Sequence, residues 1–252
     1  MTRLAVLLLS AAVASAALAD TACYELQTLT AKPGKLDELH AWLRDHRDDV
    51  LTKHGAECLA FLVPAGESPD RRVLCLYRFP SLIESVEAGR ALKADPAWKP
   101  LDTAHDSPAL LLEKAEVVGL SATDYSPAFT PARAGQPRVF ELRTYTCPSP
   151  ERLALLNERF RNHTVKLFAK HGMENLIYWK ARDIDDADRK LIYLLGHKSQ
   201  DAAKQSFGAF RKDPDWLAAK EASEKKAGGS LTNAENGVLS EFFIATEYSP
   251  LR

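Results

Sequence analysis

Two stretches of the chain, RDHRDDVLTKHGAE at 44–57 and RNHTVKLFAKHGME at 161–174, repeat one pattern 117 residues apart. Both keep a histidine in the third position and both contain Lys-His-Gly. Repetition of this length calls for a search for further pairs before any element is assigned. Three more pairs exist: YELQT (24–28) with FELRT (140–144), ADPAWKPL (94–101) with KDPDWLAA (212–219), and SATDYSP (121–127) with IATEYSP (244–250). The chain therefore contains an internal duplication.

The spacing between matching segments grows slowly along the chain, as expected for two copies that differ by small loop insertions. The largest insertion falls in the Gly- and Asn-rich stretch 224–237, which is typical of a loop. A segment rich in Pro and small residues, AFTPARAGQP at 128–137, separates the copies. We therefore predict a first domain at 20–127, a linker at 128–137 and a second domain at 138–252.

Each copy has the same predicted order of elements. A short strand is followed by a helix, two apolar runs separated by a polar loop, a second helical region and a final strand. Residues with strong capping preferences support these boundaries: Ser149-Pro150 at a helix start, Asp95-Pro96 and Asp213-Pro214 at helix restarts, and Gly55 and Gly172 at helix ends. The order β-α-β-β-α-β predicts an α+β fold of two tandem ferredoxin-like units.

The first helix of each copy carries an apolar stripe that includes two histidines. The stripes have identical spacings: Leu36, Leu39, Leu43, His46, Val50 and His54 in copy one, and Leu153, Leu156, Phe160, His163, Leu167 and His171 in copy two. Helical periodicity places each stripe on one face. His46 and His163 are therefore expected on the buried side, and His54 and His171 at helix ends, where they suit the helix dipole and the last carbonyls.

The second copy resembles the NIPSNAP family, within the dimeric α-β barrel superfamily. The resemblance is carried by FELRTY (140–145), by the helix ending in Lys-His-Gly (170–172) and by LIYW (176–179). The first copy keeps Glu25-Leu26 and His54-Gly55 but departs from the pattern elsewhere. The resemblance implies that the two units press sheet to sheet and form an intramolecular barrel with helices outside. It implies little about activity, because the superfamily includes cofactor-free monooxygenases, haem-binding enzymes and proteins without known chemistry.

Strand alternation places Glu141, Arg143 and Tyr145 on one face of the strand that opens copy two. We expect the other, apolar face to meet the helices, so that these three side chains point into the space between the sheets. Glu141 and Arg143 are close enough to pair. They form either a polar network that fixes the register of the sheets or a pocket for an anionic or carbonyl-bearing ligand. Copy one offers only Glu25 and Gln27, so such a pocket is expected in copy two.

His163 is interpreted either as a satisfied core histidine or as a haem ligand or general base. Tyr178 and Trp179 alternate on a hairpin strand, so one should face each side; they fill the core or form an aromatic wall for a ligand. No metal site is expected, because His46 and His54 lie about 12 Å apart along a helix. The ligand-binding candidates are Glu141, Arg143, Tyr145, His163, Tyr178 and Trp179, and haem is the one cofactor considered.

Cys58 and Cys75 lie symmetrically about the loop PAGESPD (64–70). On neighbouring antiparallel strands they would be directly opposite, so we expect them to lie close together. Whether they form a disulfide depends on geometry, because cross-strand pairs often fit poorly.

The first nineteen residues have the features of a signal peptide: Arg3, an apolar run, and Ala17-Leu18-Ala19 before Asp20. We therefore expect a periplasmic or secreted protein with no membrane insertion after signal removal. Without Arg3, 32 basic residues remain against 34 acidic ones. This balance gives no basic surface for nucleic acid.

Three functions remain open: a module that binds a small apolar or anionic ligand, an enzyme (a cofactor-independent monooxygenase or haem protein), and an interaction protein. Binding or interaction ranks above catalysis because no group of residues demands a reaction. The chain is expected to be a monomer with an internal pseudo-dimer, and a further oligomer is compatible with the sequence.

Overall fold

The computed structural model describes residues 22–50, 52–66, 70–101, 110–132 and 138–252. The predicted signal peptide at 1–19 lies outside them. Elements of the first half are β1 (Cys23–Ala31), α2 (Leu36–Val50), η1 (Thr52–His54), β2 (Glu57–Pro64), β3 (Arg72–Phe79), α3 (Leu82–Ala94), η2 (Pro96–Leu101) and β4 (Leu112–Ala122). No helix in the described part of the chain is long and apolar enough to cross a membrane.

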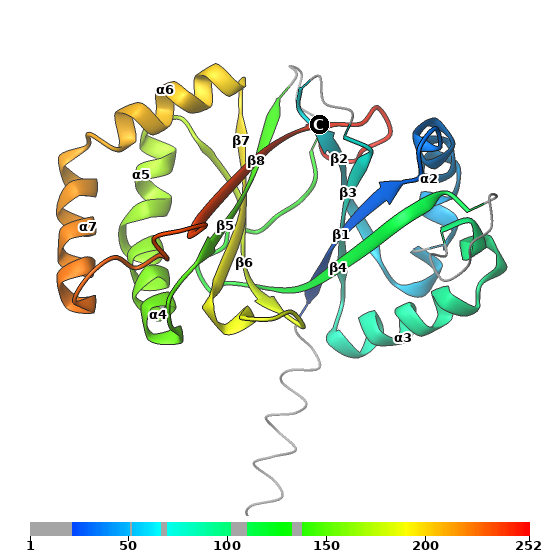
Figure 1. The fold of residues 1–252 in the computed structure, drawn as a ribbon, viewed down its shortest axis with the longest axis horizontal. Helices are drawn as coiled ribbons and strands as arrows, with labels where there is room; N and C mark the ends of the chain where they lie inside the picture. Colours follow the sequence, from blue (N-terminus) through cyan, green and yellow to red (C-terminus); the bar gives the residue numbers. More distant parts are fainter. Residues whose placement is uncertain (1–21, 51, 67–69, 102–109, 133–137) are drawn as a thin grey trace, which may run out of the picture.

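Elements of the second half follow a similar order. They are β5 (Val139–Thr146), α4 (Pro150–Arg159), η3 (Phe160–Thr164), α5 (Val165–Lys170), β6 (Glu174–Arg182), η4 (Ala187–Arg189), β7 (Lys190–His197), α6 (Gln200–Phe210), α7 (Pro214–Ala227) and β8 (Val238–Ala245). Figure 1 shows the strands in the centre, with α2 and α3 on one side and α4 to α7 on the other. The fold is therefore a mixed α+β fold with helices outside a central sheet.

The eight strands form one closed antiparallel barrel in the order β1-β3-β2-β8-β5-β7-β6-β4. Each half supplies four neighbouring strands, and two seams join the halves. At one seam β2 pairs with β8, from Leu62↔Ala245 to Pro64↔Phe243. At the other β4 pairs with β6, from Gly119↔Arg182 to Ala122↔Trp179. Closure leaves no sheet edge open, so every strand has a partner on both sides.

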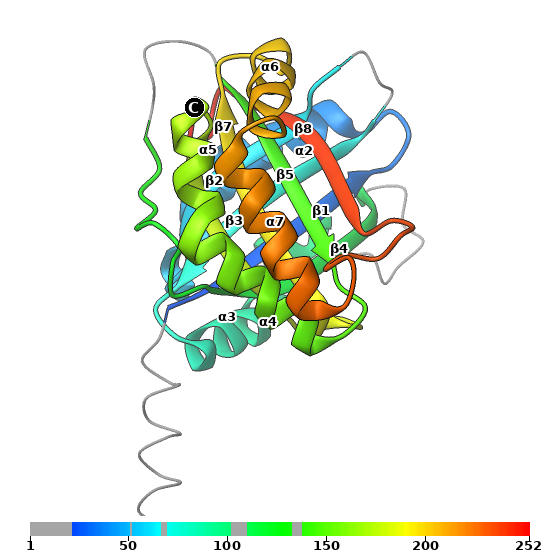
Figure 2. The same cartoon turned by 90° about the vertical axis from the view of Figure 1, so that its left-hand side faces the viewer.

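Three apolar clusters fill the molecule. The barrel interior contains inward side chains of both halves, among them Leu26, Leu76, Phe140, Trp179 and Phe243. A second cluster lies between the first-half sheet and its helices, and a third between the second-half sheet and α4 to α7. Figure 2 shows α4, α5, α6 and α7 lying across the outer face of the second-half strands. Each sheet therefore has one face in the shared interior and one face under its own helices.

The segment that ends each repeat packs on the other repeat. Tyr125 donates a hydrogen bond to Asn157 on α4 (Oη to Oδ1, 2.6 Å), and its ring packs in the second-half helix layer. Tyr248, its counterpart after β8, lies 2.7 Å from His40 Nδ1 on α2 and packs in the first-half layer. The repeated Tyr-Ser-Pro motif therefore ties each half to the helix layer of the other.

The serines of these motifs hold backbone groups. Ser249 Oγ accepts a hydrogen bond from the Phe61 amide (3.0 Å), and Ser126 Oγ accepts one from the Tyr178 amide (2.9 Å). In each case a serine that follows one half's last strand binds the second strand of the other half. The two contacts are equivalent, as the repeat pattern requires.

The first helix of the second half contains a π-helical turn at Phe160–Thr164. The amide of Val165 donates to the carbonyl of Phe160, five residues earlier. A π turn adds a residue and rotates the following helix by about 100°. As a result Thr164, at 1% exposure, takes the buried place predicted for His163, and the His163 side chain is exposed. The prediction of a buried His163 is wrong for this reason.

Several predicted helix ends are confirmed. Ser149 caps α4 with Pro150 in its first turn, and Asp213 caps α7 with Pro214 following. Gly172 has a φ of 77°, which only glycine adopts without strain. Asp95-Pro96, by contrast, starts the 3₁₀ helix η2 and not an α-helix.

The histidine at the end of α5 binds a side chain and not the last carbonyls. His171 Nε2 lies 2.7 Å from Asp213 Oδ2, which also pairs with Lys170 at 2.8 Å. The C-terminal end of α5 is therefore bound to Asp213, the N-cap residue of α7, through both side chains. His46 is half-buried on α2, with its ring 5.3 Å from that of Trp42, and the side chain of His54 lies outside the described residues.

The expected register of the two hairpin cysteines is wrong. Cys58 pairs with Tyr77 and Cys75 with Phe61, and a β-bulge lies between Cys58 and Ala60. The bulge and the position of the turn make the cysteines diagonal and not direct neighbours, so they share a face without being opposite. None of the four cysteines, all of which the structure describes, is in a disulfide.

We expect Ser249→Ala to reduce the free energy of unfolding by about 2 kcal/mol, because it leaves the buried Phe61 amide without an acceptor. Ser126→Ala should have a smaller effect, because Ser126 is half-buried. Urea unfolding measures both. Ser206→Ala on α6 is the control and should change stability by less than about 0.5 kcal/mol. Equal stability of Ser249→Ala and this control would contradict the role given to the crossing motif.

Candidate functional site

The polar side chains of β5 form a buried cluster under the second-half helices. Arg143 donates from Nη1 to Glu141 Oε1 (2.5 Å) and from Nε to Tyr193 Oη (2.9 Å). The other carboxylate oxygen, Glu141 Oε2, lies 2.9 Å from His197 Nε2, and Ser240 donates to Oε1 (2.5 Å). Both carboxylate oxygens and much of the guanidinium are therefore bonded within the protein. The predicted Glu141–Arg143 pair is confirmed.

The direction predicted for this cluster is wrong. Phe140 faces the barrel interior, where it is fully buried, so its neighbour Glu141 faces the helices. The middle of the interior is enclosed by both sheets and is filled with apolar side chains, so a charged group there would have few partners. Under the helices Glu141 meets His197 and Ser240, which replace the water that it loses.

Burial alone would raise the pKa of Glu141, but the hydrogen bonds from His197 and Ser240 and the Arg143 charge outweigh it. The pKa of Glu141 therefore lies below its ordinary value of 4.5. This carboxylate stays ionised at neutral pH. An ionised carboxylate with both oxygens bonded acts as a structural anchor and is poorly suited to abstract a proton.

Aromatic rings occupy the rest of this helix layer. Tyr178 stacks on Tyr193 with centroids 5.1 Å apart, and Phe160 contacts both. The guanidinium carbon of Arg143 lies 4.6 Å from the centroid of the Phe207 ring on α6. Phe207 therefore covers the cluster from the helix side and fills the space next to Arg143.

The matching place in the first half is an open cleft. Phe207 is the eighth residue after the N-cap Ser199 of α6, and Gly89 is the eighth after the N-cap Ser81 of α3. Glycine leaves the space empty, and a cavity of about 430 Å³ lies between α3 and the sheet. Glu25, the counterpart of Glu141, lines it. An open cleft therefore lies beside Glu25 in copy one, whereas Phe207 fills the equivalent space beside Glu141 in copy two.

Neutral groups fix the carboxylate of Glu25 in this cleft. Ser85 on α3 donates to Glu25 Oε1 (2.6 Å), and Gln27 donates to Oε2 (3.0 Å). The side chain is half-buried. The Glu25 side chain therefore remains in contact with the cavity. Unlike Glu141, it is held by hydrogen bonds from uncharged groups only.

The second half contributes one wall of the first-half cleft. Arg182 and Asp183, at the end of β6, reach the cavity across the β4–β6 seam. A Cβ at Gly119 would lie 2.4 Å from Asp183 Oδ2 and 3.2 Å from Arg182 Nη2. A side chain at this position would displace the end of the Asp183 side chain from the wall. Arg182 Nε is buried without a hydrogen-bond partner, so the wall carries a donor that is not yet satisfied.

Apolar side chains surround the mouth of the cleft. Leu82, Val86 and Val117 line it and are 41%, 46% and 52% exposed. Ile83, on the same helix, is 55% exposed. Exposed apolar side chains that gather around a cavity mark binding surfaces more often than scattered ones do. The cleft thus combines an apolar entrance with charged groups inside.

The predicted candidate residues do not share one site. Glu141, Arg143, Tyr145 and Tyr178 lie together under the second-half helices. Trp179 faces the barrel interior, with its ring 6.0 Å from that of Tyr24. Tyr178 and Trp179 therefore face opposite sides, as predicted. No group of three or more His, Cys, Asp or Glu side chains in the described ranges could hold a metal ion.

The second half of the chain is similar to a known protein family. Residues 140–250 match the family model described as NIPSNAP. The matched region, less than half of the chain, is termed the NIPSNAP domain. Its bounds include the Glu141 cluster, α4 to α7 and the crossing Tyr248. A comparison with curated proteins found no match.

Solved structures extend the likeness beyond the NIPSNAP domain to the whole chain. A putative monooxygenase from Fusobacterium nucleatum is 11% identical, with a TM-score of 0.57, and the match covers 90% of this chain and 93% of that one. A putative monooxygenase from Lactobacillus acidophilus is 12% identical, with a TM-score of 0.53 and coverage of 91% and 98%. At these identities the likeness shows the fold alone.

A NIPSNAP family protein from Agrobacterium tumefaciens is 24% identical over 43% of this chain and 94% of its own, with a TM-score of 0.35. Most residues that line the open cleft, Gly89 and Gly119 among them, lie outside the NIPSNAP domain, whereas Arg182 and Asp183 lie within it. An alignment of the sequences of α3 and α6 would have placed Gly89 at the position of Phe207.

We expect Glu141→Gln to destabilise the NIPSNAP domain by about 3 kcal/mol at pH 7, because it leaves Arg143 buried without its carboxylate. Since the folded pKa of Glu141 lies below the unfolded one, its stabilisation is present above the unfolded pKa and is lost as pH falls through the folded value. The variant should therefore lose stability less steeply on acidification. Urea unfolding at several pH values measures this.

The matched control is Glu25→Gln, which changes the equivalent carboxylate in the first half. Its partners Ser85 and Gln27 are uncharged, so a smaller loss is expected. A loss equal to that of Glu141→Gln would contradict the importance of the Arg143 ion pair.

Proposed function

We propose that the chain binds a small molecule in the first-half cleft, with an apolar body at the mouth and an anionic end inside. The observation that carries the proposal is the exchange of Phe207 for Gly89 at equivalent places. The NIPSNAP domain fills this space with its own side chain, and the first half leaves it open. A volume of about 430 Å³ is within the range of small-molecule sites.

The charged groups of the cleft support an anionic end. Arg90 and Arg182 line it from opposite sides, α3 and β6. A carboxylate or similar group would supply an acceptor to the donors of Arg182, whose Nε has none. Glu25 and Asp183 would orient a hydroxyl or amide donor on the same ligand. Leu82, Val86 and Val117 would cover its apolar part.

Cofactor-independent oxygenation is the second candidate function. It is favoured by the whole-chain likeness to two proteins called putative monooxygenases and to one called anthrone oxidase-like, which is 15% identical with a TM-score of 0.52. Glu25 is the carboxylate that a bound substrate would meet, and it would accept a proton from an acidic C–H or O–H. Molecular oxygen would be the co-reactant.

Haem does not fit this cleft. The residues that line it include no His, Cys, Tyr or Met, which are the side chains that hold haem iron. His163 lies instead beside a cavity of about 140 Å³, below the usual size of small-molecule sites. No step of the proposed function therefore uses haem.

For the architecture, we propose that residues 20–127 and 138–252 are two tandem ferredoxin-like units, the first also NIPSNAP-like, and that 128–137 links them. The shared order of elements and the equivalent Tyr125 and Tyr248 contacts support this. Two such units in one chain would make a monomer with an internal pseudo-dimer. Equilibrium sedimentation would contradict this by giving twice the chain mass.

We also propose that residues 1–19 direct export to the periplasm or beyond. The support is the Arg3, apolar run and Ala-Leu-Ala pattern before Asp20. Expression of the full chain in a bacterium, followed by N-terminal sequencing of the periplasmic fraction, should give a protein that begins at Asp20. A cytoplasmic protein that retains Arg3 would contradict the proposal.

For ligand binding we expect Gly89→Phe to close the cleft without unfolding the protein. A Cβ added to Gly89 would have no heavy atom within 4 Å, and Phe is the side chain at the equivalent place in α6. The anionic, apolar dye ANS should bind the unmodified protein saturably, and the variant should lose at least tenfold in affinity. Fluorescence titration measures both.

The matched control is Gly208→Phe, the same change on α6 away from the cleft. It should leave dye affinity unchanged. Equal dye affinity of all three proteins would contradict the proposed site. Oxygen consumption with an anthrone, measured on the same samples, tests the second function: uptake that Gly89→Phe abolishes favours oxygenation, and no uptake by the unmodified protein contradicts it for that substrate.

A further inference from the structure

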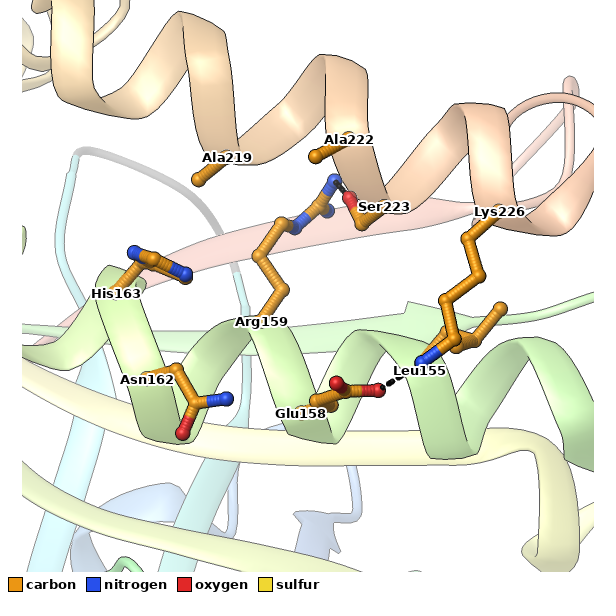
Figure 3. Close-up of a pocket in the computed structure, with 9 residues that line it drawn as sticks. All are labelled: Leu155, Glu158, Arg159, Asn162, His163, Ala219, Ala222, Ser223 and Lys226. Carbon is orange, nitrogen blue, oxygen red and sulfur yellow. Dashed lines mark hydrogen bonds and ion pairs between the residues drawn. The ribbon is translucent and has the colours of Figure 1, made fainter.

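A second small cavity lies far from the cleft, in a groove between α4–η3 and α7. Its volume is about 140 Å³. Figure 3 shows Arg159 rising from α4 toward Ser223 on α7, with His163 on the next turn and the Glu158–Lys226 pair at the other end. Ala219 and Ala222 form the α7 wall, and their short side chains leave the space open.

Arg159 is a buried cation with few partners. It is 7% exposed, although it lies on a surface helix. Nη1 donates to Ser223 Oγ (3.2 Å), the guanidinium carbon lies 4.9 Å from the centroid of the Trp216 ring, and Nε is buried without a hydrogen-bond partner. A guanidinium has five N–H donors, and of those of Arg159 the buried Nε lacks an acceptor while Nη1 has one hydroxyl.

The charges around the groove are not balanced. Lys226 pairs with Glu158 at 2.9 Å, which neutralises the carboxylate that lines the cavity. Arg159 forms no ion pair within the described part of the chain. The lining thus has two cations, Arg159 and Lys226, and one carboxylate, Glu158. A buried charge without a counter-ion is costly.

The first half shows that the fold does not require a cation here. The 117-residue offset of the first helices places Trp42 at the position of Arg159. Trp42 packs edge-on to Trp98, with ring centroids 5.4 Å apart, as Arg159 packs on Trp216. An aromatic side chain therefore fills this groove in one half, and the other half holds an arginine. Packing alone does not explain the arginine.

The π turn gives the groove its second wall. It directly follows Arg159 and turns Asn162 and His163 away from the core, so that both line the cavity. Both side chains can donate hydrogen bonds. π turns of this kind often occur at functional sites. The same distortion that made the buried-His163 prediction wrong thus places His163 one turn from Arg159 on the α7 side of the helix.

We propose that this groove binds a small oxyanion, a carboxylate or phosphate group, on Arg159. The bound group supplies the acceptor that Nε of Arg159 lacks, and His163 and Ser223 line the same cavity. The planar guanidinium fork matches both kinds of oxyanion. The cavity is large enough for such a group alone, so a free anion or the end of a longer molecule would occupy it. This site is independent of the first-half cleft.

The test observes the Arg159 side chain directly. In ¹⁵N-labelled protein, the Arg159 Nε–Hε resonance is assigned as the one that Arg159→Met removes. Inorganic phosphate and acetate are titrated separately, with sodium chloride keeping the ionic strength constant. We expect a saturable shift of this resonance with a Kd on the order of 1 mM. A shift with phosphate alone identifies a phosphate site, and a shift with acetate alone a carboxylate site.

Two variants keep the test decisive. Arg161→Met removes an exposed arginine two residues away and should leave the Arg159 shift intact. Ala222→Leu keeps Arg159 but narrows the groove, and it should abolish the shift while the remaining spectrum stays that of the folded protein. Folded protein whose Arg159 resonance does not respond to either anion, or responds equally in Ala222→Leu, overturns the proposal.

Discussion

The structure depends on contacts in which the last segment of each repeat packs on the other repeat. A four-stranded sheet from one half alone would have unpaired backbone groups along both edge strands. The β2–β8 and β4–β6 pairings satisfy these edges. Tyr125 and Tyr248 then cross to the opposite helix layer, where each buried hydroxyl finds one polar partner. Because each half completes the other, apolar side chains fill the middle of the barrel. The Glu141 cluster, the Gly89 cleft and the Arg159 groove all lie outside it, under or between the helices.

Although the two halves have the same order of strands in the barrel, single residue differences give them different cavities. Gly89 opens the space that Phe207 fills, and Arg159 occupies the place of Trp42. Arg182 and Asp183 show the reverse relation, because they belong to the NIPSNAP domain and form a wall of the first-half cleft. The cleft is therefore a product of both halves, although its opening is due to one residue.

The sequence predicts those features that follow from short-range pattern. The duplication, the caps at Ser149 and Asp213 and the Glu141–Arg143 pair required only spacing and residue type. The face of β5 was predicted wrongly, because alternation says which side chains share a face and not which face meets the barrel interior. The place of His163 was missed because one added residue in a π turn rotates everything after it. The bulge between Cys58 and Ala60 changed the hairpin register for a similar reason. In each of these cases a local irregularity or a tertiary contact outweighs the periodic signal.

The open cleft was missed for a different reason. Its decisive residues, Gly89 and Gly119, have no functional group that attracts attention in a sequence. Gly89 matters because it lacks the ring that Phe207 has at the equivalent place. Gly119 matters because it has no Cβ next to Asp183 and Arg182. Comparison of the two copies position by position would have revealed the first. The second requires knowledge that β4 and β6 are neighbours.

Joining both halves of the barrel in one chain removes a restriction that symmetry imposes on a homodimer. In a homodimer every cavity occurs twice, and a mutation that opens the cavity in one subunit also opens the equivalent cavity in the other. Here each copy is encoded separately, so one copy can keep a filled, rigid layer while the other gives up packing. A ligand of the Gly89 cleft would accordingly bind once per barrel, without the pairwise cooperativity available to twofold-symmetric assemblies.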